Sequence, residues 1–124
     1  MPYKANWVKK GVEWIFHGHV TGEEILTACM NIYGDSRFDG LSYKIVDFMD
    51  VEGIQLTEES VKKIAYFDMA AAKTNPTLNV AIVSNDDVLE SYSGLYAAYM
   101  TETTWDIQFF VDRESVSAWQ QTIS

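Results

Sequence analysis

A short, mainly apolar run, Asn79 to Val83, constrains the fold of this chain more than any other feature. It stands between two helix signals. The Asn75-Pro76 pair ends a helix because the residue before proline avoids helical geometry, and Asp86 is suited to cap the next helix. Runs without polar alternation are expected in strands that are covered on both faces of a parallel sheet. The run therefore predicts an α/β fold.

The rest of the chain continues this alternation of strands and helices. Two segments, residues 6–10 and 13–20, predict an N-terminal hairpin with a turn at Lys10-Gly11. Thr21 and Glu24 have the spacing of a capping box, and Gly34 is suited to end that first helix. The other predicted elements are a loop over 35–41, a strand over 43–48, a helix from Thr57 to Asn75, the strand over 79–83, a helix from Asp86, a strand over 107–111 and a final helix capped by Asp112.

The predicted order is β-β-α-β-α-β-α-β-α. Strands that alternate with helices imply a mostly parallel sheet with right-handed crossovers, and the opening hairpin supplies one antiparallel edge. A chain of 124 residues is long enough for one ordinary domain and too short for two. We therefore predict a single domain over residues 1–124.

Composition and charge exclude several classes of protein. With 48% hydrophobic residues the chain has enough apolar surface to fold, which argues against a disordered segment. A single cysteine, Cys29, permits neither an intramolecular disulfide nor a cysteine-rich zinc site, and its place on a helical apolar stripe predicts an inert core thiol. The net charge of −9 argues against nucleic acid or an anionic membrane as a partner. We expect a cytoplasmic protein without a transmembrane segment or a cofactor.

An acidic group, Asp47, Asp50 and Glu52, is predicted at the carboxyl end of the middle strand. Open parallel sheets bind ligands at that end, near a topological switch point, so this is a candidate ligand-binding or partner-binding site. Its carboxylates could bind a divalent cation or act as acid and base. The alternative, which we favour, is a solvated acidic loop, because neither a glycine-rich phosphate loop nor a nucleophile accompanies the group.

Aromatic and sulfur-containing side chains form a second candidate site, an apolar pocket between the second and third predicted helices. Tyrosine suits half-buried positions, where its ring packs and its hydroxyl meets a polar group. The alternatives are that the group belongs to the core or to a partner interface. Its members are Phe38, Met49, Tyr66, Phe67, Tyr92, Tyr96 and Tyr99.

Three further features have a functional and a plainer explanation. His17 and His19 would share one face of a strand and could bind a metal, but we favour two partly exposed side chains on an edge hairpin and predict no metal site. Residues 74–112 contain six carboxylates and neither lysine nor arginine, which could steer a basic partner or simply provide solubility. The edge strand near Trp7 could support a homodimer.

Several segments, in this order, resemble the SpoIIAA-like bacterial proteins. The segments are Gly18–Glu24, Asp35–Phe38 before a strand that ends in Asp47, Leu56–Glu59, Val80–Val83, Ser93–Tyr96 and Phe109–Trp119. The resemblance implies a STAS-like fold, shared with anti-sigma-factor antagonists and related in shape to CRAL-TRIO lipid carriers.

One departure limits what this resemblance implies about function. STAS-type antagonists carry a phosphorylated serine in an Asp-Ser pair where the middle strand leads into the second helix. Residues 47–57 contain no such pair, and Asp35-Ser36 lies in the preceding loop. Thr57 is a candidate site residue there, but a helix cap explains it better. We expect a non-enzymatic regulatory or protein-binding module; the alternative is a small carrier of an apolar, lipid-like ligand.

Overall fold

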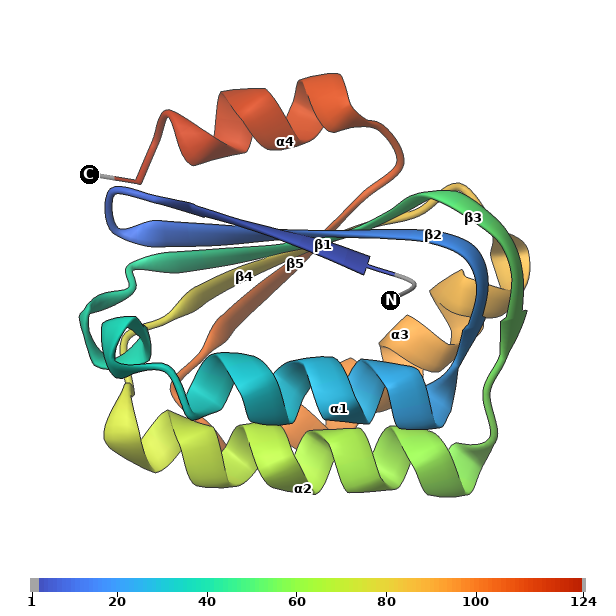
Figure 1. Cartoon of the computed structure of the whole chain (residues 1–124), viewed down its shortest axis with the longest axis horizontal. Coiled ribbons are helices and arrows are strands. Elements are labelled where there is room, and N and C mark those ends of the chain that lie inside the picture. The colour runs from blue at the N-terminus through green and yellow to red at the C-terminus, as the bar shows by residue number, and fades with distance from the viewer. Residues whose placement is uncertain (1–2, 124) are drawn as a thin grey trace.

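A computed structural model describes residues 3–123 and shows one α/β domain (Figure 1). β1 pairs with β2 in an antiparallel hairpin, and β2, β3, β4 and β5 are joined by parallel ladders, which confirms the predicted fold class. No helix in the described part is long and apolar enough to cross a membrane. The elements are β1 Tyr3–Val8, β2 Gly11–Thr21, α1 Gly22–Tyr33, the 3-10 helix η1 Ser36–Gly40, β3 Tyr43–Gln55, α2 Glu58–Thr74, β4 Asn79–Val83, α3 Asp87–Met100, β5 Asp106–Phe110 and α4 Arg113–Gln120.

The order of the strands in the sheet is the order of the strands in the chain, β1-β2-β3-β4-β5. Right-handed crossovers that always step in the same direction place their helices on the same face of the sheet. Figure 1 shows this arrangement, with α1, α2 and α3 on one face and the terminal helix α4 on the other. Because the strand order never reverses, this sheet has no topological switch point. That part of our argument for Asp47 and Asp50 is wrong.

The main core lies between the sheet and the layer of α1, α2 and α3. Along β3, Lys44, Val46 and Phe48 face this layer of helices. Tyr43, Ile45 and Asp47 face α4 on the other side of the sheet. Phe16 on β2 stacks on Phe48 with the ring centroids 5.2 Å apart. A smaller apolar cluster on the opposite face is completed by Val116 of α4.

The helix signals in the sequence are confirmed, whereas several strand boundaries differ. Thr21 caps α1 in a capping box with Glu24, Asp86 caps α3 and Asp112 caps α4. The first strand is Tyr3–Val8 rather than 6–10, because the turn lies at residues 9–10, where Lys10 has a φ of 65°. The predicted loop over 35–41 contains η1, and β5 is displaced by one residue from the predicted 107–111.

The largest difference concerns β3, which runs to Gln55 instead of ending at residue 48. It pairs with β4 only as far as Asp47, and beyond that point it continues as a ribbon with β2 alone. The β2–β3 register shifts twice there, and both shifts place an extra residue in β3. Such bulges bend a strand. Figure 1 shows β2 and β3 curving together around the end of the sheet.

Candidate functional site

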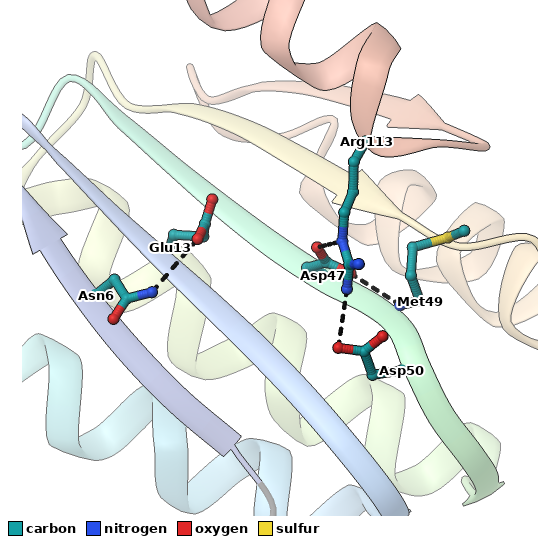
Figure 2. Close-up of polar contacts among 6 residues, drawn as sticks. All are labelled: Asn6, Glu13, Asp47, Met49, Asp50 and Arg113. Carbon is teal, nitrogen blue, oxygen red and sulfur yellow. Dashed lines mark hydrogen bonds and ion pairs between the residues drawn. The ribbon is translucent and has the colours of Figure 1, made fainter.

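Two of the three acidic residues predicted at the end of the middle strand, Asp47 and Asp50, form an ion-pair cluster with the first residue of α4 (Figure 2). The third, Glu52, is exposed and forms no ion pair with the described residues. Arg113 Nε lies 2.6 Å from Asp47 Oδ2, and its Nη2 lies 3.0 Å from Asp50 Oδ2. The Asp47 carboxylate is almost fully buried, and its Oδ1 also accepts a hydrogen bond of 2.8 Å from the Met49 backbone N–H. The cluster therefore fixes the start of α4 to the middle of the long strand β3.

A bulge explains why two residues three positions apart in a strand reach the same guanidinium. Ile15 pairs with Asp47, but the next pair is His17 with Asp50, so Phe48 and Met49 both lie opposite a single β2 residue. The extra residue interrupts the simple alternation of faces. Asp50 can therefore point to the α4 side with Asp47, and both contact Arg113, as Figure 2 shows.

The charges of this cluster connect α4 to β3. The hydrogen bond that Arg113 donates to the Asp47 carboxylate raises the pKa of Arg113 above its ordinary value, and Asp50 adds to the effect. The Asp47 carboxylate accepts hydrogen bonds from Arg113 and from the Met49 N–H. A cleft of about 370 Å³ between the sheet and α4 adjoins the cluster, and Glu13 lines it too. Among residues 3–123, no three acidic, histidine or cysteine side chains gather into a metal site.

We expect the Arg113→Ala variant to lose about 1–3 kcal/mol of unfolding free energy, because it leaves a buried carboxylate without its charged partner. Half of the Arg113 side chain is exposed, which keeps the loss below that of a fully buried pair. Urea denaturation measures the change. Lys63→Ala is the control, because Lys63 is an exposed cation on α2 that forms no ion pair with the described residues and should contribute no measurable stability. Equal losses in the two variants would contradict the anchoring role.

A second polar cluster, absent from the sequence predictions, lies inside the main core. Lys44 on β3 and Asp68 on α2 are both buried, and Lys44 Nζ lies 3.7 Å from Asp68 Oδ2. The hydroxyls of Tyr33 and Tyr96 donate to the two carboxylate oxygens of Asp68. Lys44 Nζ also donates to the Tyr33 hydroxyl over 2.8 Å. Every charged group here has a partner, which is the condition for burying it.

Aromatic rings surround the Lys44 ammonium. It lies 4.9 Å from the ring centroid of Trp14, 5.0 Å from that of Trp105 and 5.3 Å from that of Tyr33. Ring faces are electronegative and attract a desolvated cation at such distances. The Trp105 indole N–H donates to the Asn75 carbonyl, but the buried Trp14 Nε1 has no hydrogen-bond partner in the described part of the chain.

Three weakly acidic groups of this cluster, the hydroxyls of Tyr33 and Tyr96 and the thiol of Cys29, have raised pKa values. Burial, together with the nearby Asp68 charge, raises the pKa of Tyr33 and of Tyr96 well above 10.0. Cys29 is also buried, and burial is the main cause that raises its pKa far above the ordinary 9.0. The thiol therefore stays protonated, which agrees with the predicted unreactive core position.

The structure does not bring the predicted aromatic group into one pocket. A cavity of about 70 Å³ lies between the sheet and the helices, and only Tyr92 and Tyr96 of the group line it. Tyr66 and Phe67 are exposed on α2, so they do not contribute to it. The other three members are also elsewhere: Phe38 is buried against Tyr33 and Trp105, Met49 packs on the α4 face, and Tyr99 is half-buried at the edge of the core.

The remaining candidates have structural explanations. Thr57 caps α2, and its hydroxyl accepts from the Ser60 N–H over 3.0 Å. His17 and His19 are exposed on β2 and belong to no group of three metal-binding side chains within residues 3–123. Trp7, at the predicted dimer edge, is covered by Arg37, whose guanidinium carbon lies 3.9 Å from a Trp7 ring centroid.

The sequence contained signals for part of the missed cluster. Lys44 is two and four residues before Val46 and Phe48 in β3. Because every second side chain of a strand points to the same face, this spacing already placed Lys44 on the core face. Asp68 falls on the inward stripe of α2, four residues after Ile64 and seven after Val61. Arg113 had no comparable signal, because its partners are 63 and 66 residues earlier in the chain.

Comparison with known proteins identifies the architecture alone. A five-stranded sheet with three helices on one face and one on the other defines the class of this domain. The fold matches a solved structure of the anti-sigma factor antagonist SpoIIAA in its unphosphorylated form, with a TM-score of 0.59 over 97% of this chain and 96% of that chain. The two sequences are 9% identical. No family model and no curated protein sequence matches this chain.

Proposed function

We propose that this chain is a non-enzymatic protein-binding module that contacts a basic, amphipathic surface of a partner protein. The observation that carries the proposal is an exposed surface of acidic and apolar side chains where β4 and β5 end, which we call the acidic edge. Its residues are Asp86, Asp87, Val88, Glu90, Phe109, Val111 and Asp112.

Two segments of the chain are held together to form the acidic edge. The Ser84 N–H donates a hydrogen bond of 3.0 Å to the Phe110 carbonyl, just beyond the last β4–β5 pair. The segment that leads into α3 therefore lies beside the segment that leads into α4. Residues from both segments are exposed at this end of the sheet.

The chemistry of the acidic edge specifies the kind of partner. Val88, Phe109 and Val111 are 54%, 46% and 68% exposed, and exposed apolar groups with a polar rim are typical of protein interfaces. Residues 74–112 contain no lysine or arginine that could neutralise the surrounding carboxylates. Charge complementarity therefore calls for lysine or arginine beside apolar side chains on the partner. The structurally similar SpoIIAA is an anti-sigma factor antagonist, and antagonism of a protein factor is also a function of protein contact.

Two other functions receive less support. A cavity of about 70 Å³ is several times smaller than pockets for drug-sized ligands, so a lipid-like chain would require the helices to separate. Self-association through the acidic edge would bring like charges together in a chain with a net charge of −9. A homodimer through the β1 edge remains a prediction that light scattering can test.

The proposal is tested with the charge-reversed variant Asp87→Lys/Glu90→Lys as bait beside the wild-type chain. We expect the wild type to capture a partner whose cross-linked peptides are rich in lysine or arginine, and the variant to bind it at least about tenfold more weakly. Isothermal titration calorimetry at two salt concentrations measures the affinity, which should fall as salt rises. Asp86 and Asp112 are left unchanged because they cap α3 and α4.

Glu58→Lys/Glu59→Lys is the matched control, because it also reverses two exposed charges in the first turn of a helix. It should leave the affinity unchanged. A partner whose cross-links map to α1 or α2, or one that both variants bind equally, would refute the proposal.

A further inference from the structure

The cavity beside the buried Lys44–Asp68 pair has the features of a binding site for a small molecule. It lies between the sheet and the helix layer, and its walls are mostly side chains of the main core. It is independent of the acidic edge, since none of its lining residues belongs to that surface. Its walls come from β2, β3 and β4 on one side and from α1, α2 and α3 on the other.

One buried polar group in the wall lacks a protein partner among the described residues. Trp14 is 1% exposed and lines the cavity, and its Nε1–H has no acceptor in residues 3–123. Ser93, 8% exposed, also lines the cavity. A buried donor without an acceptor is unfavourable, and native structures nearly always satisfy such groups by some partner. The wall therefore offers one donor without a protein partner, the Trp14 indole N–H, to an occupant.

The charges around the cavity determine the charge of that occupant. Lys44 and Asp68 are both in the wall and already neutralise each other. A buried anion would be repelled by Asp68 and a buried cation by Lys44, and each would also lose its hydration. A neutral molecule avoids both penalties. Most of the wall is aliphatic or aromatic, which favours an apolar body.

The volume limits the size. A dry apolar cavity of about 150 Å³ accommodates benzene, and this cavity has about 70 Å³. We propose that the cavity between β2, β3, β4 and the helix layer binds a small neutral oxygen compound of about four heavy atoms, such as a short ketone, ether or alcohol. Its oxygen accepts the Trp14 indole N–H, and its apolar body fills the rest of the space.

Acetone is the probe, and the readout is the indole N–H resonances of the uniformly ¹⁵N-labelled full chain. We expect the Trp14 resonance, identified with the variant Trp14→Phe, to shift downfield and to saturate with a Kd of about 1 mM, the scale open to so small a ligand. Trp105, whose N–H already donates to Asn75, is the internal control. The isosteric hydrocarbon 2-methylpropene lacks the oxygen and should produce no downfield shift.

Two conservative variants of one strand place the site. Val80→Ile adds a methyl group on the cavity side of β4 and should weaken acetone binding by about tenfold or more, whereas Val83→Ile, on the α4 face, should not. Acetone should raise the Tm of the wild type, because it binds the folded state alone, and this rise should be absent in Trp14→Phe. The proposal is overturned if no saturable shift occurs, or if all four indoles shift alike. It is also overturned if 2-methylpropene reproduces the shift. A long-lived water that still accepts the hydrogen bond of the Trp14 indole N–H at saturating acetone would overturn it as well.

Discussion

Replacement of Asp68 by alanine should reduce the unfolding free energy by about 3–5 kcal/mol, as measured by urea denaturation. The carboxylate is 2% exposed and compensates the equally buried Lys44 ammonium. It also accepts the hydroxyls of Tyr33 and Tyr96. The variant would leave a desolvated cation and two tyrosine donors without their acceptor. Removing one member of a buried charged network costs far more than the network itself contributes.

A combined variant separates this explanation from a simple loss of packing. Lys44→Met, Asp68→Leu, Tyr33→Phe and Tyr96→Phe together remove both charges and both hydroxyls of the cluster at similar side-chain volume. We expect the combined variant to recover most of the stability lost in Asp68→Ala, because no buried polar group of the cluster is left without a partner. A loss below about 1 kcal/mol in Asp68→Ala, or a combined variant that is less stable still, would contradict the role given to the pair.

Stability should also decline steeply with rising pH above about pH 10. Burial raises the pKa values of Tyr33, Tyr96 and Cys29 in the folded chain, from ordinary values of 10.0, 10.0 and 9.0. The unfolded chain therefore releases these protons first, and the folded state binds more protons in this range. Each such proton lowers the unfolding free energy by about 1.4 kcal/mol per pH unit, so three can lower it by about 4 kcal/mol per pH unit. Below pH 9 this contribution is fully present.

Urea denaturation between pH 8 and 11 measures that slope. Tyr96→Phe should reduce it by about 1.4 kcal/mol per pH unit, whatever its effect on stability at neutral pH. Tyr66→Phe removes an exposed tyrosine outside the cluster and should keep the slope of the wild type. The prediction fails if the two variants have the same slope.

Local sequence signals determined the elements of this fold well. The caps at Thr21, Thr57, Asp86 and Asp112 are short-range hydrogen-bond patterns within four residues, so a linear pattern is enough to find them. The length of β3 was not predictable in this way. Residues 49–55 are a strand because β2 pairs with them, and that ladder joins residues more than 30 positions apart.

The candidate sites show the same difference between short-range features, which the sequence predicts, and long-range contacts, which it does not. Sequence reasoning located Asp47 and Asp50 but could not know that Arg113 neutralises them, since that contact requires the whole sheet and α4 to be in place. The buried Lys44 was detectable from the alternation of β3 but was not predicted, because a lysine in a strand is usually taken to be exposed. The predicted aromatic group is divided among the core, the surface and the cavity. Helix packing determines this division, and the sequence alone does not specify how the helices pack.

The agreement between chain order and spatial order has a consequence for how the protein is made. A nascent chain emerges from the N-terminus, so β1 and β2 are available before β3, and β3 before β4. Each new strand therefore joins the free edge of a sheet whose earlier members are already synthesised, and no strand has to be inserted between two partners. Domains can begin to fold from the N-terminal side during synthesis. In this one the sheet can grow in a single direction as translation proceeds, and α4, with Arg113, closes the opposite face last.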